Sequence, residues 1–147
     1  NPPRMGNGHA QVSAYGVFPV QDGQVVLAPA NDGLFRKLLT LLRRDDLLGE
    51  ARFATNAARL ENRTELDAVI AERTGQWTSA DLLAACAEAG IPAGLINDID
   101  GVFADPQVQA RTMRIDLGGV PGVRSPFIFS DAELALDRPS PRLGGDG

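Results

Sequence analysis

Two short polar segments of the chain can project hydrogen-bonding groups toward a partner. One is Gln21-Asp22-Gly23, between two apolar runs, and the other contains Asn31 and Asp32. Both can offer polar side chains and exposed backbone N–H donors. Each also has a purely structural explanation, because Asp-Gly is typical of a hairpin turn and Asn or Asp often begins a helix. The residues alone favour the structural explanation and leave a binding role open.

Nucleophilic catalysis by serine or cysteine needs a histidine beside the nucleophile, and the sequence has one histidine and one cysteine. His9 lies in a Pro/Gly-rich N-terminal segment and is expected at the surface or at a docking contact. Cys86 lies in an Ala/Leu-rich segment and is expected to be a small core residue. No Gly-x-Ser-x-Gly motif is present, and one His with one Cys cannot supply the usual zinc ligands. We therefore expect no metal site and no serine or cysteine nucleophile.

Phosphate-binding and calcium-binding patterns are weak. Gly118-Gly119 with Gly122 is a glycine cluster with no helix expected after it, so a phosphate cradle is not indicated. Asp98, Asp100 and Asp105 resemble the start of a calcium loop, but the required Gly and distal Glu are out of register. Helix capping and turn formation explain these aspartates better.

The first part of the chain predicts a hairpin followed by helices. Residues 15–20 and 24–28 are apolar runs on either side of the turn, and Pro19 places the first strand at an edge or makes it irregular. Apolar periodicity, capping residues and Gly90 then predict further elements. These are a helix over 33–42, a turn at Leu47 and Leu48, a loop over 49–55 anchored by Phe53, a helix from 55 or 56 to 73 broken near Asn62, a helix over 80–89 and a short strand over 93–96.

Two short helices, 99–103 and 106–111, and a strand, 113–117, are expected next, followed by an irregular tail. The fold class is therefore α+β: a small domain in which an antiparallel hairpin packs on helices, with long linkers on both sides. The expected organisation is a linker over 1–14, the small domain over 15–117 and a second linker over 118–147. The linkers are too polar and too rich in Gly and Pro to fold alone, so we expect them to lie on a surface elsewhere.

Composition limits the class of protein. The chain has 147 residues, a net charge of −5 and 44% hydrophobic residues, which suits one globular domain. Its pI near 4.8 argues against nonspecific binding to nucleic acid or to an anionic membrane, and no segment approaches the roughly 20 apolar residues of a membrane span. A single cysteine favours a reducing compartment, so we expect a cytoplasmic protein. The first residues lack an initiator Met and a signal pattern, which suggests a piece of a longer chain.

Several motifs, in order, resemble the second half of the family III CoA-transferases, a group that includes formyl-CoA transferase, carnitine CoA-transferases and α-methylacyl-CoA racemase. The resemblance covers nearly all 147 residues. Its segments are Tyr15-Gly16-Val17-Phe18, residues 22–28, Asn31-Asp32-Gly33-Leu34-Phe35, residues 51–56 with Arg59 and Asn62-Arg63, residues 90–94 with Asn97-Asp98, Asp105-Pro106-Gln107 with Ala110-Arg111, Ser125-Pro126 with Phe129-Ser130, and Pro141-Arg142-Leu143-Gly144.

This resemblance implies a fold, a substrate and a mechanism. Family members join a large Rossmann-like domain to a small α+β domain by two linkers, and two chains interlock as a homodimer. The substrates are an acyl-CoA thioester and a carboxylic acid acceptor, with no bound cofactor. An aspartate attacks the thioester through mixed-anhydride and aspartyl-CoA intermediates, and that aspartate belongs to the large domain, outside these residues. No catalytic residue is expected here, and this piece alone is predicted to be inactive. Gln21, Asp22, Gly23, Asn31 and Asp32 are expected as active-site neighbours.

Three departures from the family pattern matter for function. Formyl-CoA transferase has a glycine-rich loop over its active site where this chain has only Gln21-Asp22-Gly23. Racemases have Glu-Pro where this chain has Asp32-Gly33, so the Asn31-Asp32 pair favours a transferase. The chain ends Gly145-Asp146-Gly147, where family members often continue with Glu-His-Thr or Glu-Asp-Thr. A racemase and a noncatalytic docking domain remain the alternatives.

Overall fold

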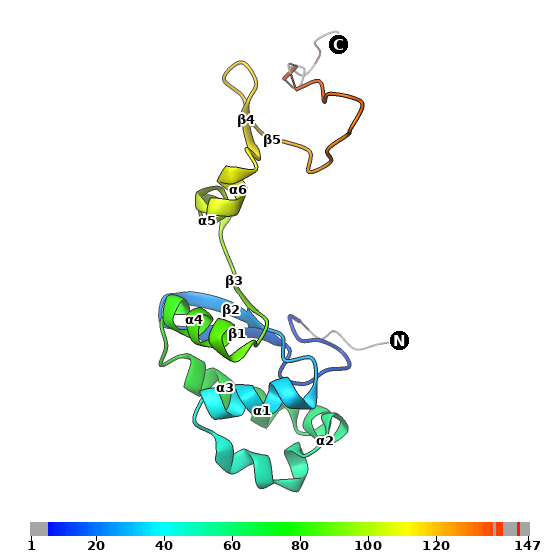
Figure 1. Ribbon diagram of the computed structural model, residues 1–147. Helices are drawn as coiled ribbons and strands as arrows, with labels where there is room; N and C mark the ends of the chain where they lie inside the picture. Colours follow the sequence, from blue (N-terminus) through cyan, green and yellow to red (C-terminus); the bar gives the residue numbers. More distant parts are fainter. Residues whose placement is uncertain (1–5, 137, 140–143, 145–147) are drawn as a thin grey trace. The chain divides into compact units, whose positions relative to one another are not determined.

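The computed structural model describes residues 6–136, 138–139 and 144, and the chain forms two compact units (Figure 1). The first unit ends at Ile96 and the second begins at Asn97. This division lies inside the range 15–117 that we expected to form one small domain. The roles of the two ends as linkers to a large domain stay predictions. The motif residues 141–143 and the final residues 145–147 lie outside the described part of the chain.

A three-stranded antiparallel sheet forms the centre of the first unit, in the order β1-β2-β3. β1 (Gly16–Val20) and β2 (Gly23–Leu27) form the predicted hairpin, and β3 (Ala93–Leu95) pairs with β2. Gly23 follows the turn with φ +152°, a conformation that glycine adopts without strain. β1 is an edge strand, which confirms the position expected from Pro19 because proline lacks an N–H for a further strand.

Local signals explain where the α-helices of this unit begin and end. Asn31 caps α1 (Asp32–Leu41) by accepting from the N–H of Leu34 at 2.9 Å. Thr55 and Thr78 cap their helices in the same way, and Gly90 ends the last one with φ +68°. These helices are α2 (Asn56–Glu61), α3 (Arg63–Thr74) and α4 (Ser79–Ala89).

The predicted break near Asn62 is confirmed, since α2 and α3 meet there. The Asn62 side chain donates to the carbonyl of Ala58 at 2.9 Å and ends α2. Two 3₁₀ helices precede α2, η1 (Asp45–Gly49) and η2 (Ala51–Phe53). The first replaces the expected turn, and the second lies where we expected only a loop. The buried ring of Phe53 anchors η2 against the core.

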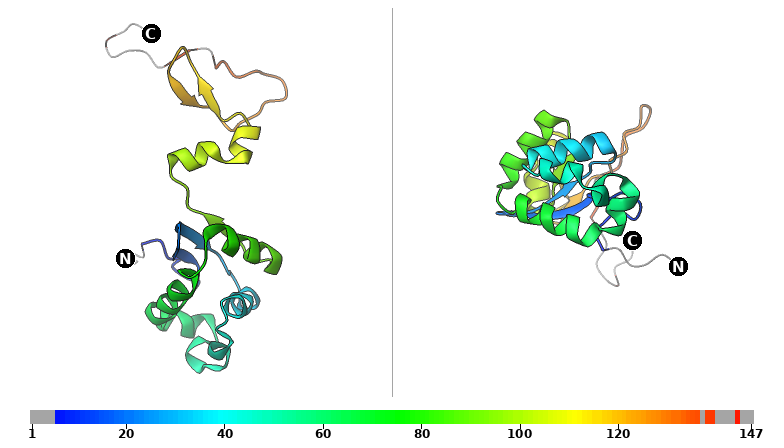
Figure 2. Two further views of the ribbon diagram at one scale, coloured as in Figure 1. Left: turned by 90° about the vertical axis from the view of Figure 1, so that its left-hand side faces the viewer. Right: turned by 90° about the horizontal axis from the view of Figure 1, so that it is seen from below.

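The core lies between the sheet and the helices, with α3 packed on β1 and α4 packed on β2 and β3 (Figure 2). Cys86 is 1% exposed, as predicted, and burial raises the pKa of its thiol. Trp77 is partly buried and packs against the core. The buried hydrophobic residues are Ala14, Phe18, Val20, Val25, Leu27, Phe35, Leu38, Leu39, Leu42, Leu47, Phe53, Leu66, Ile70, Leu82, Cys86 and Ile91.

We expected the segment before β1 to be a linker that does not fold alone, but it folds on the first unit. Residues 6–14 follow a series of turns and bends, and Ser13 and Ala14 are each 1% exposed. His9 is exposed, which confirms its expected place at the surface. The expectation was wrong because apolar periodicity, absent here, detects helices and strands but not a loop held by side-chain hydrogen bonds.

The second unit contains two short helices and a hairpin. α5 (Ile99–Ala104) and α6 (Pro106–Ala110) match the predicted helices. β4 (Arg114–Asp116) lies within the predicted strand, but it pairs with β5 (Pro121–Val123), which lies in the expected irregular tail. Two glycines with positive φ, Gly118 and Gly119, form the turn between these strands. None of the described residues after Ile96 is buried.

Candidate functional site

The hairpin tip of the sheet is tied to the start of α4. The carboxylate of Asp22 accepts from the backbone N–H of Ser79 at 2.7 Å and from its hydroxyl at 2.8 Å. Gln21 donates its backbone N–H to the carbonyl of Trp77 at 2.9 Å and its side-chain amide to the carbonyl of Gln76 at 3.0 Å. The Ser79 hydrogen bonds hold the pKa of Asp22 below its usual value. The tip is therefore a turn fixed by four hydrogen bonds to one helix end.

Asn31 and Asp32 lie at the junction between β2 and α1. The side-chain oxygen of Asn31 accepts from the N–H of Leu34 as the helix cap. One oxygen of Asp32 accepts from the guanidinium of Arg59 at 2.5 Å, while its side chain remains 55% exposed. The hydrogen bond and the positive charge of Arg59 lower the pKa of Asp32, so this group is a carboxylate at neutral pH. Because its side chain is more than half exposed, this carboxylate is accessible to a partner.

Arg59 is the buried charged residue that fixes this junction. Its side chain is 3% exposed, and its guanidinium also donates to the carbonyl of Phe53 at 3.0 Å. The guanidinium carbon lies 4.2 Å from the ring centre of Phe35, a cation–π distance. The sequence pointed to Arg59 only as part of a family motif. No local sequence pattern indicates that Arg59 is buried or that it pairs with Asp32, which lies 27 residues away.

The structure does not bring the two candidate segments together. Gln21, Asp22 and Gly23 lie at the start of β2, whereas Asn31 and Asp32 follow its other end. A strand of five residues separates such ends by about 13 Å. Each segment makes the structural contacts that the residues alone favoured. Their place beside an active site therefore stays a prediction.

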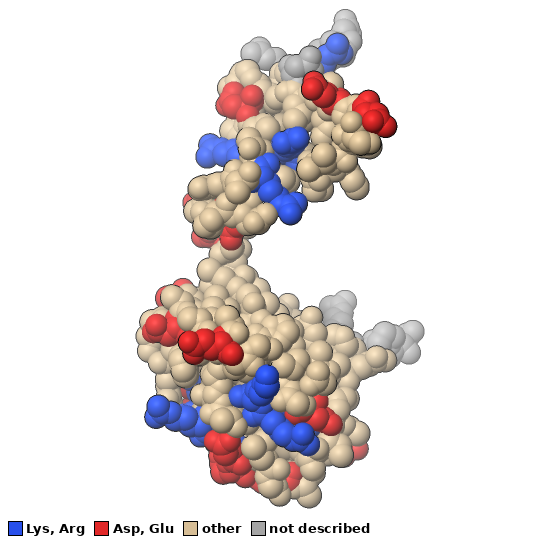
Figure 3. Space-filling model, viewed as in Figure 1, with Lys and Arg blue, Asp and Glu red and all other residues tan. Residues whose placement is uncertain are grey.

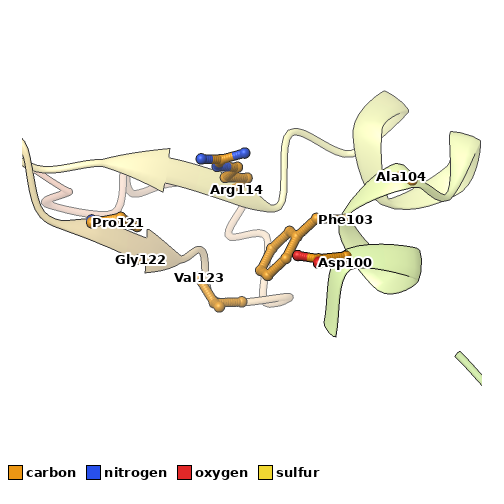
Figure 4. Close-up of a pocket in the computed structure, with 7 residues that line it drawn as sticks. All are labelled: Asp100, Phe103, Ala104, Arg114, Pro121, Gly122 and Val123. Atoms are coloured by element: carbon orange, nitrogen blue, oxygen red, sulfur yellow. The ribbon is translucent and has the colours of Figure 1, made fainter. Parts of the chain in front are cut away.

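A pocket of about 470 Å³ lies within the second unit (Figure 4). Asp100 and Phe103 of α5 face Val123 of β5, and Arg114 of β4 lies on another side of the pocket. The lining is mainly apolar, with one carboxylate and one guanidinium. These residues include no nucleophile with an adjacent base, so the pocket has no catalytic arrangement of its own.

The described residues offer neither a metal-ligating cluster nor a membrane-spanning helix. No group of three or more His, Cys, Asp or Glu side chains there can hold a metal ion. Within the same residues, no helix is long and apolar enough to cross a bilayer. Figure 3 shows basic side chains interspersed with acidic ones on the face in view.

Comparison with known proteins identifies the family. The sequence profile of CoA-transferase family III matches residues 1–147. A succinate–glutarate CoA-transferase of Agrobacterium fabrum is 45% identical over 97% of this chain, which covers 37% of that relative. The human succinyl-CoA:glutarate CoA-transferase is 29% identical over 96% of the chain, which covers 33% of it. The chain thus spans about a third of the length of the curated relatives that it matches.

Solved structures show the same fold. A CAIB/BAIF family protein from Brucella suis matches 97% of the chain with a TM-score of 0.87 and 52% identity, and the match covers 38% of that protein. The Rv3272 protein of Mycobacterium tuberculosis has a TM-score of 0.77 over 90% of the chain at 22% identity, which supports the fold alone. The α+β class expected from the sequence is confirmed. With the profile matching every residue, the chain belongs to CoA-transferase family III.

Proposed function

We propose that this chain is the small-domain portion of an enzyme that moves CoA from an acyl-CoA to a free carboxylic acid. The 45% identity to the Agrobacterium succinate–glutarate CoA-transferase, across 97% of the chain, is the observation that carries this proposal. The Asn31-Asp32 pair at the start of α1 also matches the transferase pattern. The enzyme acts as a homodimer in the cytoplasm.

The proposed reaction uses an aspartate outside this chain. Its carboxylate attacks the thioester carbonyl, which forms a mixed anhydride and releases CoA thiolate. The thiolate then attacks the aspartyl carbonyl, forms aspartyl-CoA and releases the donor acid. The acceptor carboxylate attacks the carbonyl of aspartyl-CoA, which forms a second mixed anhydride and releases CoA thiolate. The thiolate then attacks the acceptor carbonyl of this anhydride, so the new acyl-CoA leaves and the aspartate carboxylate is restored. No oxidant, metal or bound cofactor is needed, because CoA itself is the group that is transferred.

The aspartates that we singled out support a nucleophile elsewhere. Asp22 is fully engaged with Ser79, and Asp32 is held by Arg59. Both carboxylates have lowered pKa values and stay charged, and both stabilise the fold of this unit. In the longer enzyme, the hairpin tip and the exposed carboxylate of Asp32 border the active site. The hairpin tip, fixed by its hydrogen bonds, then forms a rigid side of the active site, in contrast to the glycine-rich loop that covers the active site of formyl-CoA transferase.

The substrates that we propose are short dicarboxylic acids and their CoA thioesters. The names of the relatives include succinate and glutarate in Agrobacterium, oxalate in Acetobacter aceti and mesaconate in Haloarcula hispanica. All of these acids carry two carboxylates, so one can accept CoA while the other is recognised by its charge. Succinyl-CoA as donor and glutarate as acceptor are the first pair to test.

The test is a transfer assay on the longer protein that contains this chain. Succinyl-CoA and glutarate are supplied in deuterated water, and both acyl-CoAs are followed by liquid chromatography with mass detection. We expect glutaryl-CoA to form as succinyl-CoA is consumed, with no transfer by the 147-residue chain alone. A parallel reaction supplies a 2-methylacyl-CoA in deuterated water, and deuterium at its α-carbon without any CoA transfer would instead establish a racemase. Loss of both activities would leave a docking role as the function.

A further inference from the structure

The residues from His9 to Tyr15 form a closed loop, which we call the His9 loop. The backbone N–H of His9 donates to the carbonyl of Tyr15 at 2.9 Å and closes it. Inside the loop, the imidazole Nδ1 of His9 accepts two hydrogen bonds, from the backbone N–H groups of Gln11 and Val12, each at 3.1 Å. The imidazole also stacks on the ring of Tyr15, with centroids 5.1 Å apart. One nitrogen lone pair thus holds the turn.

The His9 loop is docked on α2 and α3. The side chain of Asn56 accepts from the N–H of Ser13 at 3.1 Å and donates to the carbonyl of Gln11 at 2.8 Å. Arg63 donates to the carbonyl of Val12 at 2.9 Å. Ser13 is 1% exposed, so the loop covers part of the core. The turn inside the loop therefore positions the Ser13 N–H and the carbonyls of Gln11 and Val12 for these contacts with α2 and α3.

We propose that the His9 loop is a pH-sensitive element of the fold, closed by neutral His9 and released when His9 is protonated. Nδ1 can accept two N–H groups only while it carries a lone pair, so the proton of the neutral ring lies on Nε2. A proton on Nδ1 would face two backbone donors and would break both hydrogen bonds. This proposal does not depend on the proposed function.

The charged groups around His9 have opposite effects on a positive charge on its ring. Arg63 of α3 donates to the carbonyl of His9, so its positive charge opposes a second one on the ring. Asp67, one turn further along α3, interacts with Arg63 and offsets part of that charge. Tyr15 presents the face of a neutral ring. Since the closed loop requires unprotonated Nδ1, the closed state binds fewer protons, and its stability rises with pH.

Backbone strain favours opening once the two hydrogen bonds are lost. Ala14 has φ +61°, a left-handed conformation that is costly for a residue with a Cβ. It is also 1% exposed, so the closed loop holds it in place.

The test compares His9→Asn and His9→Ala with the wild type. The side-chain oxygen of asparagine occupies a position close to that of Nδ1 and accepts the same bonds without titrating. Amide hydrogen exchange of Gln11 and Val12 is measured at several pH values and divided by the intrinsic exchange rate. We expect protection in the wild type to fall about tenfold as the pH is lowered, since two modest hydrogen bonds are lost. His9→Asn should stay protected, and His9→Ala should be unprotected at every pH.

A second readout follows the imidazole directly. The ¹⁵N chemical shifts of the His9 ring in the wild type report which nitrogen carries the proton, and we expect the proton on Nε2 at neutral pH. The proposal is overturned if the proton is on Nδ1. It is also overturned if His9→Asn and the wild type lose protection alike as the pH falls, or if His9→Ala remains as protected as the wild type.

Discussion

The two units of this chain differ in how their apolar side chains are used. In the first unit, Leu38 and Leu82 are fully buried between the sheet and the helices. In the second, Ile99, Phe127 and Ile128 are 72%, 69% and 85% exposed, and none of the described residues is buried. Local signals such as caps and glycine turns suffice to form helices and a hairpin in the second unit. Burial of its apolar residues requires a surface that the described residues of that unit do not supply.

The largest effect should come from truncating the core of the first unit. Leu38→Ala removes a fully buried side chain and is expected to lower the free energy of unfolding by about 2–5 kcal/mol. Ile128→Ala, in the second unit, should change it by less than about 0.5 kcal/mol. Urea denaturation of both variants measures this difference. Similar losses for the two variants would mean that Ile128 is buried in solution.

The next effect should come from the buried arginine. Arg59→Ala leaves the Phe53 carbonyl without its donor and removes the partner of Asp32, and we expect a loss of about 2–4 kcal/mol. The matched control is Arg111→Ala, since Arg111 is exposed in the second unit, and it should cost less than about 0.5 kcal/mol. The same denaturation assay compares the two. Equal, small losses would contradict the structural role of Arg59.

A smaller effect is expected at the end of α4. Gly90→Ala places a Cβ on a residue with φ +68° and should cost about 1 kcal/mol. Gly49→Ala is the control, because Gly49 has no positive φ and open space where its Cβ would lie. Thermal unfolding of the two variants gives the comparison. A stabilised Gly90→Ala variant would show that this glycine has no left-handed role.

An acid dependence of stability is expected from the first unit. The lowered pKa values of Asp22 and Asp32 mean that the unfolded state binds more protons than the native state in the acid range. Stability from these contacts is present above the usual carboxylate pKa, and it is lost as the pH falls through the lowered values. Ser79→Ala and Arg59→Ala should each flatten this part of the profile, measured by urea midpoints between about pH 5 and pH 2. A profile unchanged in both variants would contradict the pairings.

The smallest effect on stability is expected for the residues after β5. For these residues the quantity to measure is self-association. The exposed side chains of Phe127 and Ile128 should cause the 147-residue chain to self-associate. A Phe127→Ser, Ile128→Ser variant should sediment as a smaller species with an unchanged unfolding midpoint. A wild-type chain that is monomeric at high concentration would show that these residues are covered.

The fold was largely predictable from local sequence patterns, and the site contacts were not. The Asp-Gly turn, the caps at Asn31 and Thr78 and the C-terminal Gly90 each act within a few residues, so the sequence indicated them directly. The contact of Asp22 with Ser79 joins residues 57 apart, and only the packed structure brings them together. β5 was missed because Gly and Pro dominate its sequence, and its partner strand rather than its own propensity defines it.

The most direct test of a transferase with its nucleophile outside these residues is covalent trapping. The longer protein is incubated with succinyl-CoA, treated with hydroxylamine, digested and analysed by mass spectrometry. We expect an aspartyl hydroxamate on one peptide outside the 147 residues, formed only when succinyl-CoA is present. A hydroxamate on Asp22, Asp32 or any other aspartate of this chain would contradict it.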